Sequence, residues 1–91
     1  MSGVYRIVLA RQAEQELLRL PPAIQRRVEA RIDDLGARPR PHDAVALTGL
    51  RNTYRIRVRD WRIVYEVRDA VLVVLVLRIG HRREVYRRLG R

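Results

Sequence analysis

The chain alternates polar and apolar residues most clearly in its central part. Arginines at every second position define the run Tyr54-Arg55-Ile56-Arg57-Val58-Arg59, and Trp61-Arg62-Ile63-Val64-Tyr65 follows after Asp60. A period of two residues is typical of a β-strand with one apolar and one polar face. A two-residue turn at Arg59-Asp60 would pair Val58 with Trp61, Ile56 with Ile63, Tyr54 with Tyr65, and Arg57 with Arg62. The pattern therefore predicts a hairpin in which two guanidinium groups lie opposite each other.

The N-terminal half predicts one strand and two helices. Val4 to Leu9 is typical of a strand, and a helical stripe then begins, formed by Ala10, Ala13, Leu17 and Leu20. Pro21-Pro22 ends this helix, and a second stripe formed by Ile24, Val28, Ile32 and Leu35 runs to Gly36. We expect an αα-hairpin with one apolar seam.

The remaining segments predict a long loop and a last strand. Residues 37–53 have no sustained period and contain Pro39, Pro41 and Gly49. In the strand from Val71 to Ile79 both alternating sets of residues are mostly apolar, which favours a central place in the sheet. A turn at Arg68-Asp69 would put Leu72 beside Tyr65, Val74 beside Ile63 and Val76 beside Trp61, and would leave Val73, Leu75 and Leu77 beside the arginines.

Together these elements predict an α+β fold in a single domain, residues 1–91. An N-terminal strand and a two-helix hairpin would pack on one face of a small antiparallel sheet, with a short C-terminal tail after Gly80. Helices can cover only one face of the sheet. We expect either the tail or a segment of a partner to cover the other face.

The charge of the chain favours a polyanionic partner. The formal net charge is +10, every basic residue except histidine is arginine, and residues 46–91 carry twelve arginines and four acidic residues. Such a field favours nucleic acid, with an affinity that depends steeply on salt. There is no cysteine, and two histidines are too few for a convincing metal site. The sequence lacks a signal-peptide core, and its apolar runs are too short to cross a bilayer, so we expect a soluble cytoplasmic protein.

The opposed arginines indicate a specific kind of ligand. Like charges facing each other across a strand pair destabilise a sheet, whereas a guanidinium fork matches the geometry of a phosphate. A bound phosphate would explain why Arg57 and Arg62 are kept together. A solvated arginine face is the alternative. Tyr54, Trp61 and Tyr65 share the apolar face, and we interpret them as core residues.

Three motifs in this order resemble the RelE family of bacterial toxins. They are Leu47-Thr48-Gly49-Leu50, the arginine hairpin from Tyr54 to Tyr65, and the ending Ile79-Gly80-His81-Arg82-Arg83-Glu84-Val85-Tyr86. The resemblance implies an mRNA interferase that enters the ribosomal A site, cleaves the codon there, and is held inactive by a cognate antitoxin. It implies as partners a small, mostly acidic antitoxin, the ribosome and mRNA, with no membrane and with DNA contact only through the antitoxin.

The resemblance also assigns residues to a site. The implied catalytic residues are Arg57, Arg62, His81, Arg82 and Tyr86, and the implied RNA contacts are Arg55, Arg59 and Arg83. Arg57 and Arg62 would clamp the phosphate, Arg82 would neutralise the leaving oxygen, and Tyr86 would stack on or orient a base. The choice between Arg82 and Arg83 stays open, with Arg82 favoured by its closer spacing to the glycine.

The implied reaction is attack by a 2′-hydroxyl on the adjacent phosphate, which requires neither a metal nor a cofactor. Arginine is too basic to accept the proton, whereas histidine titrates near neutral pH in its unperturbed state. We therefore rank His81 first as general base and Tyr86 second, and a slow nuclease positioned by the ribosome could also lack a strong base.

Two other functions remain open at this point. The ParE branch of the same superfamily shares the fold and poisons DNA gyrase by protein contact, and the fold alone cannot separate the two activities. A non-catalytic nucleic-acid-binding module is the third hypothesis, which the charge permits.

Overall fold

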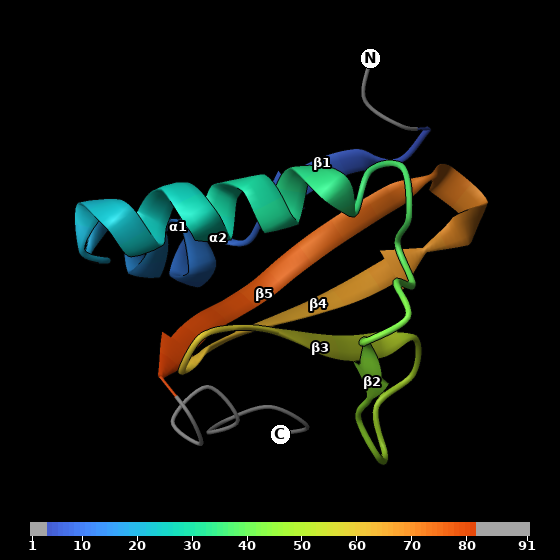
Figure 1. Cartoon of the computed structure of the whole chain (residues 1–91). Helices are drawn as coiled ribbons and strands as arrows, with labels where there is room; N and C mark the ends of the chain where they lie inside the picture. The colour runs from blue at the N-terminus through green and yellow to red at the C-terminus, as the bar shows by residue number, and fades with distance from the viewer. Residues whose placement is uncertain (1–3, 82–91) are drawn as a thin grey trace.

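The part of the chain that the structure describes folds as two helices on one side of a five-stranded sheet (Figure 1). A computed structural model describes residues 4–81. The elements in chain order are β1 (Arg6–Leu9), α1 (Arg11–Leu18), α2 (Pro22–Asp34), β2 (Val45–Ala46), β3 (Thr53–Val58), β4 (Trp61–Arg68), the 3-10 turn η1 (Asp69–Val71) and β5 (Val73–His81). The two-residue strand β2 lies in the segment predicted as loop.

The sheet is mixed and has the order β1-β5-β4-β3-β2. β1 pairs with β5 in parallel, and the other neighbours are antiparallel. The predicted α+β class is confirmed, and so is the central place of the last strand. The sheet is not wholly antiparallel, because the helical connection after β1 returns the chain so that β5 runs in the direction of β1.

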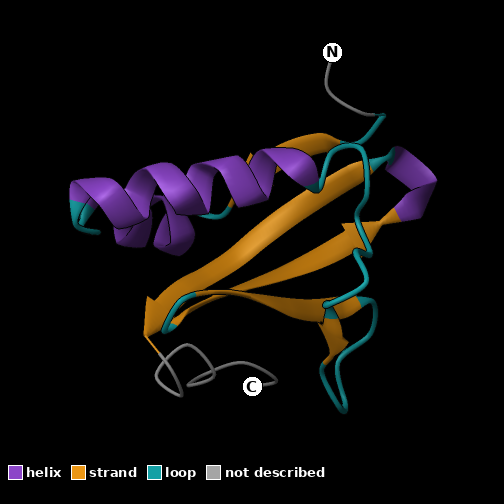
Figure 2. Ribbon diagram, in the orientation of Figure 1, coloured by secondary structure: helices purple, strands orange, loops and turns teal. Residues whose placement is uncertain are grey.

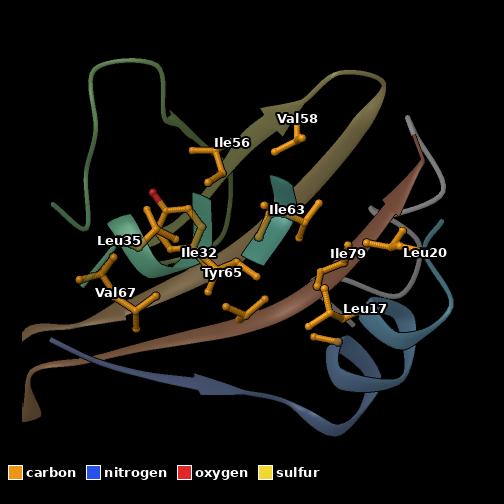
Figure 3. Close-up of a cluster of buried hydrophobic side chains, with 14 residues drawn as sticks. Leu17, Leu20, Ile32, Leu35, Ile56, Val58, Ile63, Tyr65, Val67 and Ile79 are labelled. Atoms are coloured by element: carbon orange, nitrogen blue, oxygen red, sulfur yellow. The ribbon is translucent and has the colours of Figure 1, made fainter. Parts of the chain in front are cut away.

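Both helices bury their apolar stripes against the same face of the sheet (Figure 2). α2 begins at Pro22, where a missing backbone N–H costs nothing because the first turn of a helix leaves its N–H groups unpaired. Figure 3 shows the core between the two layers, with Leu17 of α1 beside Ile79 of β5 and Ile32 of α2 beside Tyr65 of β4.

The register of the β3–β4 hairpin is the predicted one. Tyr54 pairs with Tyr65, Ile56 with Ile63, Arg57 with Arg62, and Val58 with Trp61. The turn contains Arg59 and Asp60, and Arg59 takes the left-handed conformation with φ of 56°. Two-residue hairpin turns need such a positive φ to match the twist of the strands.

The register predicted between β4 and β5 is wrong. Tyr65 pairs with Val76 and not with Leu72, a shift of four residues, and a bulge between Val64 and Tyr65 shifts the rest of the pairing by one more. The cause is a connection longer than two residues: η1 inserts a 3-10 turn, and Leu72 takes a left-handed conformation with φ of 54° before the strand begins. Because four is an even number, Val74 and Val76 still face the helices and are fully buried.

This shift changes the neighbours on the face that the helices leave uncovered. Val73 pairs with Arg68 and Leu75 with Glu66, so neither is beside Arg57 and Arg62 as predicted. On the same face Val64 is fully buried. It pairs with Arg55 on one side and Arg78 on the other, whose aliphatic stems can shield it. The tail that was expected to cover this face lies outside residues 4–81.

Candidate functional site

Arg57 and Arg62 lie directly opposite each other on the uncovered face. They are cross-strand partners in the β3–β4 hairpin, between the apolar pairs of Ile56 with Ile63 and Val58 with Trp61. These flanking pairs belong to the core or pack against it and fix the register, so the polar face inherits its alignment from the buried one. Arg57 is exposed and Arg62 is half-buried. The geometry places two cationic side chains where one anion can contact both.

Arg55 extends this cationic surface along β3. It is two residues from Arg57 and therefore on the same face, where it pairs with Val64. Neither Arg55 nor Arg57 forms an ion pair with another residue in the 4–81 range. We call Arg55, Arg57 and Arg62 the arginine face. Arg59 is exposed in the adjoining turn, at the end of the hairpin.

His81 directly follows the residue that pairs with Arg62, but its ring lies on the other side of the sheet. Gly80 is the residue that pairs with Arg62, whereas His81 pairs with Trp61. The His81 and Trp61 rings form an edge-to-face contact with centroids 5.0 Å apart and an interplanar angle of 79°. The structure therefore brings together Arg55, Arg57 and Arg62 but does not place the imidazole with them.

Glu16 of α1 holds the end of β5, a role that the sequence analysis did not identify. β1 pairs with β5 only as far as Val76, so the backbone of β5 beyond this point has an open edge. The Glu16 carboxylate accepts hydrogen bonds from the backbone N–H of Ile79 at 2.7 Å and from Arg78 Nε and Nη2 at 3.0 and 2.8 Å. A signal was present in the sequence, because Glu16 lies three residues after Ala13 and four before Leu20, which puts a carboxylate on the apolar face of α1.

The aromatic residues on the helix-covered face pack as predicted. Tyr65 is fully buried, stacks on Tyr54 with ring centroids 5.8 Å apart, and donates its hydroxyl to the Pro39 carbonyl at 2.8 Å. Burial raises the pKa of the Tyr65 hydroxyl well above its usual value, so it stays protonated as a donor. Trp61 is partly buried against the core.

A second polar network fastens the proline-rich loop at the other end of the sheet. Arg40 donates to both oxygens of Asp69, at 3.1 and 2.8 Å, and to the Tyr54 hydroxyl at 2.9 Å. Tyr5 donates its hydroxyl to Asp69 at 2.5 Å. The hydrogen bonds from Arg40 and then Tyr5 lower the pKa of Asp69 to about 2, and the bond to Asp69 raises the pKa of Tyr5. This network is structural in character, because it joins the residue before β1, the loop, β3 and η1.

Three of the predicted site residues, Arg82, Arg83 and Tyr86, lie outside the described residues. Within residues 4–81 no three His, Asp or Glu side chains are grouped so that they could hold a metal ion. The helices of this part of the chain are too short and too polar to cross a membrane.

Comparison with known proteins identifies the family. Residues 7–86 match the family model described as "ParE toxin of type II toxin-antitoxin system, parDE". The chain is 31% identical over 85 residues to Toxin RelG of Mycobacterium tuberculosis, which covers 92% of this chain and 98% of that toxin.

Solved structures agree with this match. The isolated RelE toxin of E. coli superposes with a TM-score of 0.78 at 25% identity, covering 87% of this chain and 85% of the toxin. The archaeal RelE of a RelE–RelB complex from Pyrococcus horikoshii superposes with a TM-score of 0.78 at 30% identity, covering 88% and 97%. On the family model, the relative and these folds, this chain belongs to the RelE/ParE superfamily of toxins of type II toxin–antitoxin systems.

Proposed function

We propose that this toxin is a ribosome-dependent mRNA endonuclease that cuts the codon in the A site. The observation that carries the proposal is the arginine face, in which Arg57 and Arg62 oppose each other and Arg55 adjoins them. A toxin that acted only by protein contact would not need two guanidinium groups opposed across a hairpin whose other face is buried in the core. A phosphodiester offers the anion that makes this arrangement favourable.

The proposed reaction is an in-line displacement within the RNA. The 2′-oxygen forms a bond to the neighbouring phosphorus while the bond from phosphorus to the 5′-oxygen breaks, which leaves a 2′,3′-cyclic phosphate and a 5′-hydroxyl. The nucleophile loses one proton and the leaving oxygen gains one. Arg57 and Arg62 hold the two non-bridging oxygens and stabilise the charge that builds up on them. The ribosome aligns the RNA, so that much of the rate acceleration comes from positioning.

The proton transfers belong to other groups, because arginine stays protonated at physiological pH. His81 and Tyr86 are the proposed candidates for general base. His81 is one residue from the position that faces Arg62, and its ring points to the opposite side of the sheet. To act as the base, its imidazole must turn around the end of β5, past Gly80. The alternative within this proposal is a slow reaction driven by charge stabilisation and alignment alone. Arg82 is proposed to neutralise the leaving oxygen, with Arg83 as the other possibility.

The proposal includes a cognate antitoxin. The structures similar to this chain include toxin–antitoxin complexes with RelB, from Pyrococcus horikoshii and from Methanococcus jannaschii. With a formal charge of +10, this toxin would attract a small, mostly acidic antitoxin. We propose that the toxin acts in the cytoplasm, where it would meet both the ribosome and such an antitoxin.

Inhibition of DNA gyrase is the second candidate function. The description of the matching family model, a ParE toxin, favours it. Two parallel assays separate the candidates: primer extension on mRNA bound to purified ribosomes, and supercoiling by purified gyrase. The proposal expects a new 5′ end inside the A-site codon and unchanged supercoiling. If supercoiling were inhibited and the mRNA on the ribosome stayed intact, the toxin would be an inhibitor of DNA gyrase instead.

A further inference from the structure

A small pocket lies between the end of the sheet and the junction of the two helices. Its volume is about 220 Å³. Buried Leu20 and Ile79 supply apolar lining, the half-buried rings of Trp61 and His81 line it as well, and exposed Arg19 lies at its mouth. A pocket of this size suits one planar ring system and is too small for a helix.

The two rings leave a flat surface available to a ligand. Trp61 and His81 meet edge to face, at an interplanar angle of 79°, so they do not cover each other as parallel rings would. An edge-to-face pair can accept a third planar group by stacking on a free ring face. Both side chains also carry ring N–H or nitrogen groups, and both are half-exposed. Such a wall suits a flat, polar-edged ring better than an aliphatic side chain.

The charges around the pocket favour a ligand that carries a negative group. The pocket wall contains one carboxylate, that of Glu16, and its charge is balanced by Arg78 and by the backbone N–H of Ile79. Arg19 forms no side-chain hydrogen bond or ion pair with residues 4–81. The uncompensated charge at the mouth is therefore positive.

We propose that this pocket binds one unpaired base of single-stranded RNA, stacked against the Trp61–His81 pair with Arg19 on a neighbouring phosphate. The proposal rests on the proposed function, since the base belongs to the same RNA strand whose phosphate the arginine face grips. Trp61 and Arg62 are consecutive and point to opposite faces of β4. The pocket is thus behind the arginine face at the same end of the sheet, and a strand that passes around this end contacts both.

The chain provides its own probe for this pocket, because Trp61 is its single tryptophan. The ligand in the test is a seven-nucleotide single strand of 2′-deoxynucleotides, which lacks the attacking hydroxyl and is not cut. The comparison ligand is a strand of equal length made of abasic sites. We expect the base-bearing strand to change Trp61 fluorescence in a saturable way and to bind at least about tenfold more tightly, which is about 1.4 kcal/mol at 25 °C. Equal binding and equal quenching by the two strands would overturn the proposal.

Matched variants separate stacking from general charge. Arg19, which directly follows α1, is replaced by Glu, and Arg19→Glu is compared with Arg11→Glu, the same charge change at the exposed first residue of that helix. We expect the first variant to weaken binding of the base-bearing strand at least about threefold more than the second. In an anisotropy assay with a labelled strand, we expect Trp61→Tyr to keep the affinity for the strand and Trp61→Leu to lower it about tenfold. Circular dichroism checks that both variants have the same helix content. Equal effects within either pair would contradict a base-stacking site.

Failure of the pocket proposal and failure of the nuclease proposal give different results. If ribosomal cleavage occurs but Trp61 does not respond to the base-bearing strand, the pocket proposal fails and the nuclease proposal stands. If Trp61 responds and no mRNA is cut, the nuclease proposal fails alone. A third ligand, an acidic peptide with one leucine, tests whether the pocket binds a protein segment instead. If the peptide bound saturably and the nucleotide strand did not bind, the base-binding proposal would be overturned.

Discussion

Replacing Glu16 by Ala should destabilise the fold more than any other single change of an acidic residue on α1. The carboxylate accepts four hydrogen bonds, two from Arg78, one from the Ile79 backbone and one from the Gln12 side-chain amide. The alanine variant leaves a cation and a backbone N–H without these acceptors at the open edge of β5. Because Gly80 and His81 follow directly, the loss should also loosen the strand end beside Arg62.

The burial of this ion pair sets the size of the effect. Removing one partner of a fully buried pair costs about 3 to 5 kcal/mol. The Glu16 and Arg78 side chains keep 15% and 18% of their exposure, so water reaches the site and reduces this penalty. We expect a loss of about 2 to 3 kcal/mol in the free energy of unfolding, which for a domain of this size lowers Tm by roughly 10 to 20 °C. Glu16→Gln keeps an acceptor oxygen without the charge and should cost about 1 kcal/mol.

Urea unfolding followed by circular dichroism measures these differences, with Glu14→Ala as the control. Glu14 is exposed on the same helix and its replacement should cost about 0.5 kcal/mol or less. If the unfolding free energy of Glu16→Ala stayed within about 0.5 kcal/mol of the intact chain, the carboxylate would not be a cap for β5, and our account of the strand end would be wrong.

Three further predictions concern pH, salt and the general base. The pKa of Asp69 is lowered from 3.8 to about 2, so its hydrogen bonds to Arg40 and Tyr5 stabilise the fold above the ordinary pKa and are lost as the pH falls towards 2. The difference in unfolding free energy between the intact chain and Asp69→Asn should therefore be constant above about pH 5 and shrink below it. A difference that grew in acid would contradict this prediction. Arg55→Ala should reduce the slope of log affinity against log salt for single-stranded RNA by about 0.7, and an unchanged slope would remove Arg55 from the phosphate contacts. His81→Ala should slow single-turnover cleavage by about 100-fold or more and flatten its dependence on pH, whereas an unchanged pH profile would assign the proton transfer elsewhere.

The β3–β4 hairpin could be predicted from the sequence in full. Strict alternation fixes which side chains share a face, and the two residues Arg59-Asp60 between the runs fix the register. The opposition of Arg57 and Arg62 followed from these two facts. Local signals suffice here because the strands are adjacent in the chain and the turn is as short as a hairpin allows.

The register of β5 could not be predicted in the same way. The residues on both faces of the strand are apolar, so its pattern does not distinguish one register from another. Its connection to β4 contains η1 and Leu72 with a positive φ, an unusual conformation for a leucine that no residue in this segment signals. The even shift preserved the buried residues Val74 and Val76, but it moved Leu75 away from the arginines.

The site was predicted in part for a related reason. Arg55, Arg57 and Arg62 were found by periodicity, whereas the orientation of His81 depends on the bulge between β4 and β5, which adds one residue and decides which face each later side chain takes. Glu16 acts across the fold on Ile79, 63 residues away in the chain. Contacts of this kind depend on the tertiary structure and leave only an indirect trace, a charged residue within an apolar stripe.

The central claim is that the arginine face grips the scissile phosphate of mRNA, and cleavage by Arg62→Ala on purified ribosomes tests it most directly. The control is Arg6→Ala, the same substitution at an exposed position on β1, far along the sheet. We predict that Arg62→Ala lowers the single-turnover rate by about 100-fold or more, as loss of a preorganised charge-stabilising group does, while Arg6→Ala stays close to the intact chain. Equal rates for the two variants, with both proteins folded, would contradict the account.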